Sequence, residues 1–97
     1  MGKFVKEISD SDFSLVENTK VPVVVDFGAS WCAPCRMIEP ILEEVAEEKE
    51  GEVLILKVNV DNCPNITQKF GIRSVPTIIL FKSGEEVRKK IGAFSKD

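Results

Sequence analysis

The stretch Val23–Val45, VVVDFGASWCAPCRMIEPILEEV, decides the fold. Its first residues belong to an almost wholly apolar run, residues 21–28, that is rich in β-branched side chains. Such a run is typical of a strand buried on both faces of an α/β sheet. Apolar residues then recur at helical spacing from Ala33 to Glu50, with glutamates filling the other face. The sequence therefore predicts a central strand that leads directly into an amphipathic helix, with two cysteines where they join.

The rest of the chain continues this alternation. We expect three further strands, at residues 3–8, 52–60 and 75–81. We also expect two short helices, which end near Asn18 and Phe70. A hairpin turn at residues 82–85 leads into a more polar strand, which we expect at the sheet edge. Three strand–helix pairs followed by two strands predict an α/β three-layer domain. At 97 residues, we expect one domain covering residues 1–97.

Composition excludes several classes of function. A net charge of −3 gives no electrostatic footprint for nucleic acid or for an anionic membrane. No apolar run approaches the roughly 20 residues that span a bilayer, and the charged N-terminus does not resemble a secretory signal. We therefore expect a cytoplasmic location, with which an odd number of cysteines agrees. The chain has no His, so acid–base chemistry falls to Asp, Glu, Lys or Cys.

The two cysteines of the join, Cys32 and Cys35, have the spacing C-x-x-C. In a first helical turn this spacing brings both sulfurs to one side, close enough to bond. Cys32 would lie at the helix N-terminus, where free N–H groups and the helix dipole lower a thiol pKa and favour a nucleophilic thiolate. Cys35 would lie one turn deeper and be shielded. Pro34 fits the first turn, where its missing N–H has no partner to lose.

Two other readings of the pair remain. A zinc site needs four ligands, and without His only Cys63 is left, so two chains would have to share the metal. An inert structural disulfide would stabilise little across so short a loop, and a reducing cytosol would open it. A C-x-x-C that follows a buried strand in a βαβ pattern favours a redox site, and we expect no metal.

A set of residues runs in one order along nearly the whole chain: Asp26-Phe27, Trp31-Cys32-Ala33-Pro34-Cys35-Arg36, Pro40, Lys57, Asp61, Phe70-Gly71-Ile72-Arg73, Val75-Pro76-Thr77, Phe81, Gly84 and Gly92. In these residues the chain resembles the thioredoxin family. The resemblance implies a thioredoxin-like fold, a mixed sheet of about five strands with helices on both faces. It also implies reduction of disulfide-containing proteins, no bound cofactor, and electrons from a thioredoxin reductase.

Two positions and the C-terminal segment depart from the family pattern. Thioredoxins usually have Gly where this chain has Ala33, and often Trp where it has Gly28. They also end in an amphipathic helix, which would begin at the final GAFSKD. The resemblance therefore implies a C-terminally truncated form that leaves one apolar row of the strand at 75–81 partly bare. We expect such a surface to support a homodimer, for example by exchange of an element.

Asp26 interrupts the apolar strand and is expected to be buried with a raised pKa, because both faces of the strand should be covered. The alternative is a solvated Asp at a strand end. Lys57, in the neighbouring strand by the resemblance, could reach it. Because Cys35 must lose a proton to resolve a mixed disulfide and no His is present, Asp26 is the candidate base. The resemblance supports this role, acting through a water.

The resemblance also implies a substrate surface beside the cysteines. Val75-Pro76 would be a cis peptide whose Val75 backbone pairs with an extended substrate segment. The residues expected to bind substrate are Trp31, Ala33, Pro34, Ile72, Val75, Pro76, Gly92 and Ala93. Core packing is the alternative for Ile72 and Val75. Cys63 is interpreted as an ordinary surface thiol, or as a site of regulatory oxidation or intermolecular bonding.

The sequence thus predicts a protein disulfide reductase in which Cys32 attacks a substrate disulfide and Cys35 resolves the mixed disulfide. An oxidant or isomerase would use the same residues, with the direction set by the reduction potential. A thioredoxin-fold binding module or chaperone subunit is also possible on fold alone, as is an inactive fragment.

Overall fold

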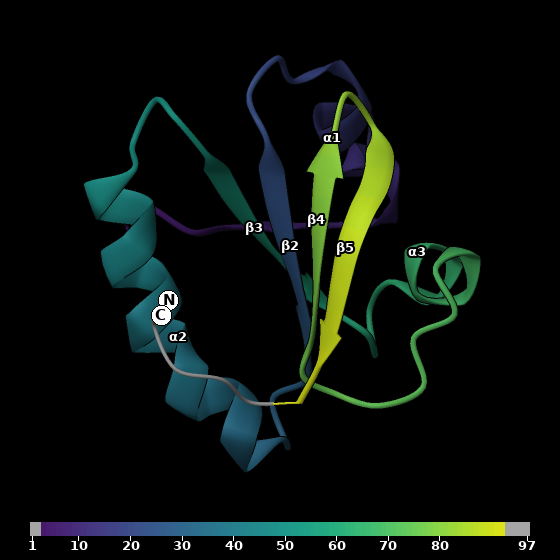
Figure 1. Cartoon of the computed structure of the whole chain (residues 1–97). Helices are drawn as coiled ribbons and strands as arrows, with labels where there is room; N and C mark the ends of the chain where they lie inside the picture. The colour runs from purple at the N-terminus through teal and green to yellow at the C-terminus, as the bar shows by residue number, and fades with distance from the viewer. Residues whose placement is uncertain (1–2, 93–97) are drawn as a thin grey trace.

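Five strands form one mixed sheet in the order β1-β3-β2-β4-β5 (Figure 1). The structure is a computed structural model that describes residues 3–92. The strands are β1 (Lys6–Ile8), β2 (Val23–Gly28), β3 (Leu54–Asn59), β4 (Thr77–Lys82) and β5 (Glu85–Ile91). β1 and β2 run parallel to β3, whereas β4 is antiparallel to β2 and to β5. The predicted element order, the mixed sheet and the edge position of the last strand are confirmed.

Helices cover both faces of this sheet (Figure 1). They are the 3-10 turn η1 (Asp10–Asp12) and the α-helices α1 (Ser14–Asn18), α2 (Ala33–Glu48) and α3 (Pro64–Lys69). The Asp12 carboxylate accepts a hydrogen bond of 3.0 Å from the Ser9 N–H, which satisfies a backbone donor where η1 begins. None of these helices, within residues 3–92, is long and apolar enough to cross a membrane.

The face of the sheet toward α1 and α3 carries the larger core. Val23, Val25 and Phe27 of β2 point to this face and are fully buried. Phe81 of β4 packs edge-on against the Phe70 ring, with ring centroids 5.1 Å apart. Burying large aliphatic and aromatic side chains stabilises the fold by about 1.5–3 kcal/mol each, so this core fixes β2 and β4 firmly.

The opposite face of the sheet holds α2. Ile38, Leu42 and Ala46 recur every four residues along the helix and pack on Ile55 of β3. Because α2 follows β2 after only four residues, its N-terminus is held at the C-terminal end of the central strand. Asp26 and Gly28 alternate with the buried valines, so both face α2. The fold therefore places the cysteine pair above an acidic residue in the sheet.

Strand β4 shows the alternation predicted for its apolar residues. Thr77, Ile79 and Phe81 are buried, whereas Ile78 and Leu80 are half-buried on the other face. Ile78 and Leu80, with Arg88, Lys89 and Lys90 of β5, line an open hollow of about 350 Å³. The expectation of a missing final helix concerns residues after Gly92, which lie outside the described part of the chain.

Candidate active site

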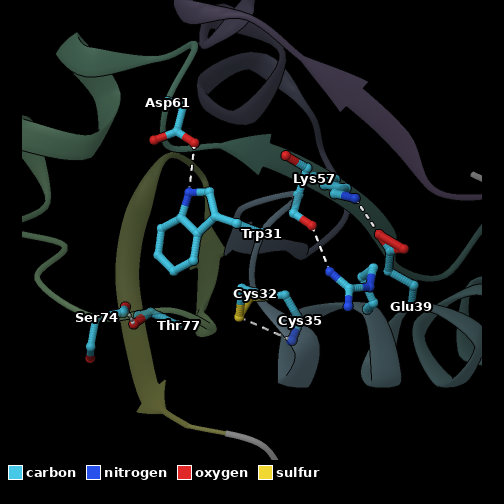
Figure 2. Close-up of a disulfide and its surroundings, with 10 residues drawn as sticks. Trp31, Cys32, Cys35, Glu39, Lys57, Asp61, Ser74 and Thr77 are labelled. Carbon is cyan, nitrogen blue, oxygen red and sulfur yellow. Dashed lines mark hydrogen bonds and ion pairs between the residues drawn. A yellow bond between two sulfur atoms is a disulfide. The ribbon is translucent and has the colours of Figure 1, made fainter.

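The cysteine pair lies where the sequence places it, at the start of α2. Cys32 is the N-cap residue of the helix and forms a disulfide with Cys35, with the two Cα atoms 5.3 Å apart (Figure 2). The Cys35 N–H donates a hydrogen bond of 3.2 Å to Cys32 Sγ. A free N–H at a helix start stabilises negative charge, so the same donor would support a Cys32 thiolate once the disulfide is reduced.

Both cysteines are shielded. Cys35 is 3% exposed, as predicted, and Cys32 is only 5% exposed. Ala29 is buried with them, and Val60 and Val75 pack against the cluster. The Val75-Pro76 peptide is cis, as the resemblance implied. The disulfide therefore lies in apolar surroundings, with Val75 at its border.

Trp31 is 67% exposed and stands beside the cysteines. Its indole N–H donates a hydrogen bond of 2.8 Å to the Asp61 carboxylate, which holds the ring between Asp61 and the cysteine pair (Figure 2). Trp31 also lines a hollow of about 130 Å³ together with Ile72 and Val75. Ile72 and Val75 are half-buried, so each contributes both to core packing and to the surface near the disulfide.

The remaining residues that we predicted to bind substrate differ in their exposure to solvent. Ala33 and Pro34 are exposed in the first turn of α2. The Gly92 N–H donates a hydrogen bond of 2.8 Å to the Pro76 carbonyl oxygen, which brings the end of β5 beside the cis peptide. Pro76 is fully buried, so its ring offers no contact surface and Val75 alone of this pair is accessible. Ala93 lies outside the described residues.

Asp26 is 1% exposed, which excludes a solvated carboxylate at a strand end. Its Oδ1 atom is buried without a hydrogen-bond partner among the described residues. Burial raises the pKa of Asp26 to about 7; the Lys57 ammonium opposes this rise and the Glu39 carboxylate adds to it. The predicted burial and raised pKa are confirmed.

Gly28 lies between Asp26 and Cys35. A Cβ atom added at Gly28 would be 3.3 Å from Cys35 Sγ and 3.9 Å from Asp26 Oδ1. Both functional atoms therefore border the space above this glycine. The arrangement brings the buried carboxyl and the shielded sulfur to the same side of β2.

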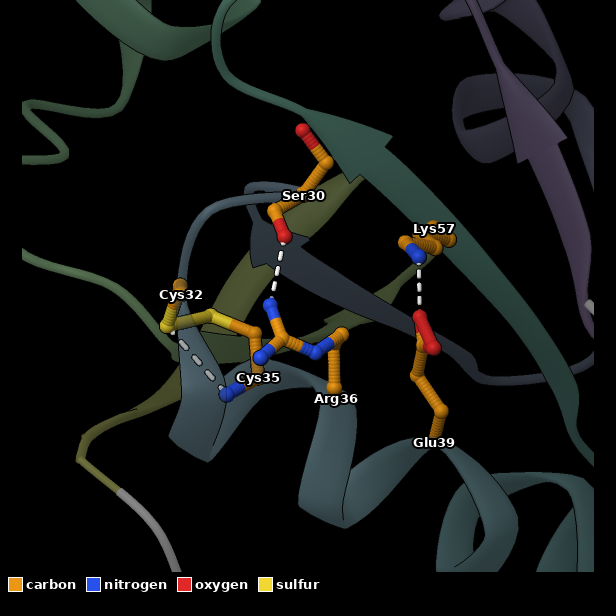
Figure 3. Close-up of polar contacts among 6 residues, drawn as sticks. All are labelled: Ser30, Cys32, Cys35, Arg36, Glu39 and Lys57. Atoms are coloured by element: carbon orange, nitrogen blue, oxygen red, sulfur yellow. Dashed lines mark hydrogen bonds and ion pairs between the residues drawn. A yellow bond between two sulfur atoms is a disulfide. The ribbon is translucent and has the colours of Figure 1, made fainter.

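Lys57 does not pair with Asp26 as the sequence suggested. The two residues are directly opposite in the β2–β3 register. The Lys57 ammonium instead forms an ion pair with Glu39, which reaches across from α2 (Figure 3). Lys57 acts on Asp26 only through space. Glu39 was not predicted as a site residue, although its position four residues after Cys35 places it on the same side of the helix.

Cys63 is not the surface thiol that the sequence suggested. It is 1% exposed and belongs to the larger core, although it directly precedes α3. Its side chain turns inward, where Sγ contacts the Ile8 carbonyl oxygen at 3.5 Å. Burial raises the pKa of the Cys63 thiol, so the helix start does not activate it. Residues 3–92 contain no cluster of three His, Cys, Asp or Glu side chains that could hold a metal.

The sequence of the chain is similar to that of known proteins over nearly its whole length. The thioredoxin family model matches residues 4–97. A curated protein named "Thioredoxin" from Rickettsia felis is 48% identical over 94 residues, which cover 97% of this chain and 82% of the relative. "Thioredoxin" from Pyropia yezoensis is 46% identical over 93 residues, covering 95% and 87%. "Thioredoxin 1" from a Nostoc species is 44% identical over 91 residues, covering 93% and 85%.

Proposed function

The chain belongs to the thioredoxin family and is a thiol–disulfide reductase, and we propose that it works by a two-step dithiol exchange in which Cys32 attacks and Cys35 resolves. The observation that carries this assignment is the position of the pair. Cys32 caps α2 and accepts the Cys35 N–H, whereas Cys35 lies within the helix. The two thiols therefore have different electrostatic surroundings, with the thiolate favoured at Cys32.

In the first step, the Cys32 thiolate attacks one sulfur of a substrate disulfide. A bond forms between Cys32 Sγ and that sulfur as the substrate S–S bond breaks. The other substrate sulfur leaves as a thiolate and takes a proton from solvent. One end of the substrate is then held as a mixed disulfide.

In the second step, Cys35 loses its proton to Asp26, directly or through one water, and attacks Cys32 Sγ. The mixed disulfide breaks, and the second substrate sulfur leaves as a thiolate that is protonated. Two electrons have passed to the substrate, and the protein retains the Cys32–Cys35 disulfide. The role of Asp26 is supported by its burial, by a pKa of about 7 and by the shared border at Gly28.

The substrate would lie along the surface formed by Trp31, Pro34 and Val75. The hollow that Trp31, Ile72 and Val75 line supports an apolar contact there. The Val75 backbone would pair with an extended substrate segment, and Ala33, Gly92 and Ala93 would border it. Fixing the substrate chain in this way would align its disulfide with Cys32.

Three finer points belong to the same proposal. A thioredoxin reductase would return the disulfide to the dithiol. We place the protein in the cytoplasm, with which an odd number of cysteines agrees. Two copies would associate through the half-buried row of Ile78 and Leu80, which the open hollow beside β5 leaves accessible.

Trapping of the mixed disulfide tests the order of attack. Cys35→Ser should accumulate a covalent adduct with a disulfide-containing protein such as insulin, joined through Cys32, because the resolving thiol is absent. Cys32→Ser should form no such adduct and lose reductase activity. Full activity of Cys32→Ser would favour the binding-module alternative. Equal trapping by both variants would show that the two thiols are not differentiated.

The reduction potential of the Cys32–Cys35 pair, measured against glutathione, would separate a reductant from an oxidant or isomerase by the sign of the difference.

A further inference from the structure

The ion pair between Lys57 and Glu39 lies beside the active site, and the proposed chemistry does not yet use it. Glu39 is on α2, one helical turn beyond Cys35, and Lys57 is on β3 (Figure 3). Their side chains are 33% and 17% exposed, so the pair lies at the rim of the buried region. An isolated surface ion pair would matter little to stability. This pair differs because a buried carboxyl lies within the reach of its cation.

Asp26 is the group that Lys57 would otherwise bind. The two residues are in register on neighbouring parallel strands and point to the same face of the sheet. Neighbouring strands are about 4.8 Å apart, a distance that a lysine side chain spans easily. Yet Asp26 Oδ1 has no hydrogen-bond partner among the described residues. The lysine is thus directed toward Glu39, and in the part of the chain that the structure describes no cation is bonded to the carboxyl opposite it.

The charged and titratable groups around Asp26 are few. From α2 it faces Cys35 and Glu39, and from β3 it faces Lys57. Its register partner on β4 is Ile78, which is uncharged, and Lys90 of β5 lies beyond Ile78. Within residues 3–92, Lys57 is the cation that lowers the pKa of Asp26, so its placement decides how strongly the charged form of Asp26 is stabilised.

We infer that Glu39 is a positioning residue: by binding the Lys57 ammonium, it keeps this cation from pairing with Asp26 and so keeps the buried carboxyl able to exchange its proton during turnover. The inference rests on the proposed role of Asp26. A carboxylate paired with lysine has a pKa lowered by about 1–3 units, which would make it a poor proton acceptor near neutral pH. Glu39 favours the protonated form of Asp26 through its own charge, which raises the pKa of Asp26. It also favours that form by binding the Lys57 ammonium.

The direct test is the titration of Asp26 in the reduced protein, followed by the carboxyl ¹³C signal of aspartate-labelled chain and assigned with Asp26→Asn. Glu39→Gln should lower the pKa of Asp26 by about one unit or more, because Lys57 becomes free to pair with it. Glu47→Gln is the matched control, since it removes the same charge from an exposed position on the same helix. It should leave the titration where it is in the unchanged protein.

A Lys57→Met background separates the two ways in which Glu39 can act. If Glu39 positions the lysine, Glu39→Gln should shift the titration by less than half as much once Lys57 is gone. An equal shift in both backgrounds would show that Glu39 acts by its own charge alone, and would overturn the positioning role. So would an unchanged titration in Glu39→Gln, or an equal shift in Glu47→Gln.

The pH profile of mixed-disulfide resolution distinguishes this inference from the proposed function. If the resolution profile of Glu39→Gln moves to lower pH together with the Asp26 titration, both hold. If the titration moves and the profile does not, Asp26 is not the base, while the positioning by Glu39 stands. If Asp26→Asn loses the pH dependence but Glu39→Gln leaves the titration unchanged, the base stands and the positioning role is overturned.

Discussion

Asp26 on β2 lies directly opposite Lys57 on β3, yet the Lys57 ammonium forms its ion pair with Glu39 instead. The carboxyl is buried, and its Oδ1 atom has no hydrogen-bond partner within residues 3–92. A buried acid without a full set of partners destabilises the folded state when it is charged. The same residue that we propose as the base is therefore expected to lower stability.

Replacing this acid should stabilise the fold in a pH-dependent way. The folded protein keeps the Asp26 proton up to about pH 7, whereas the unfolded chain loses it near the ordinary pKa of 3.8. Stability therefore falls as pH rises from about 4 to about 7, because the folded state binds the extra proton over this interval. We expect Asp26→Asn to match the unchanged protein near pH 4 and to exceed it by up to about 4 kcal/mol above pH 8. Urea unfolding of the disulfide form at several pH values measures this, with Glu47→Gln as an exposed control; a pH-independent difference would contradict it.

The same carboxyl should shape the kinetics of release. Only the charged form of Asp26 accepts the Cys35 proton, so the rate of mixed-disulfide resolution should rise with pH through about pH 7. Asp26→Ala should slow resolution at neutral pH by about 100-fold or more, which is the usual contribution of a general base, and change adduct formation less. Stopped-flow measurement of the two steps separates them. Resolution at the unchanged rate would refute the role of Asp26.

The hydrogen bond from Trp31 to Asp61 should orient the indole for substrate contact. Asp61→Ala removes the acceptor of this hydrogen bond. We expect the loss of about 1 kcal/mol of net hydrogen-bond free energy, and a several-fold higher KM for protein substrates because the indole is no longer oriented. Asp61→Asn keeps an acceptor and should behave nearly as the unchanged protein. Because Trp31 is the sole tryptophan, its fluorescence anisotropy and iodide quenching report the ring directly. Identical anisotropy in Asp61→Ala would show that the bond does not hold the ring.

Self-association should depend on the half-buried row of β4. Sedimentation velocity is expected to show a concentration-dependent increase in mass, which Leu80→Lys should abolish by placing a charge among Arg88, Lys89 and Lys90. Lys82→Ala, an exposed change at the end of the same strand, serves as the control. A monomer mass that is constant over the whole concentration range would contradict the prediction.

Local patterns predicted the frame of the site. The apolar run of β2, the helical spacing of α2 and the C-x-x-C at their join each depend on residues close in sequence, and each was confirmed. The burial of Asp26 also followed, because a strand covered on both faces leaves no solvated position. These features are dictated by secondary-structure period and by the order of the elements.

Contacts between elements were less predictable. Lys57 and Glu39 are 18 residues apart. The sequence near either residue does not indicate whether Lys57 pairs with Glu39 on the helix or with Asp26 on the neighbouring strand. Trp31 and Asp61 are 30 residues apart and meet only because β3 ends beside the start of α2. The prediction of a surface thiol at Cys63 was wrong, because the side chain of a residue just before a helix can point outward or inward. Here it points inward and is buried in the core beneath α3. Such choices depend on tertiary packing.

The most direct test of the account is site-resolved alkylation of the reduced protein from about pH 5 to pH 10, followed by mass spectrometry of each cysteine peptide. We predict that Cys32 reacts with a pKa below the ordinary thiol value, because the Cys35 N–H supports its thiolate, while Cys35, which lies within α2, reacts slowly. Cys63 should react only on unfolding, since it is buried in the core. If all three thiols react alike, with an ordinary thiol pKa, the start of α2 does not activate Cys32 and the proposed mechanism is wrong.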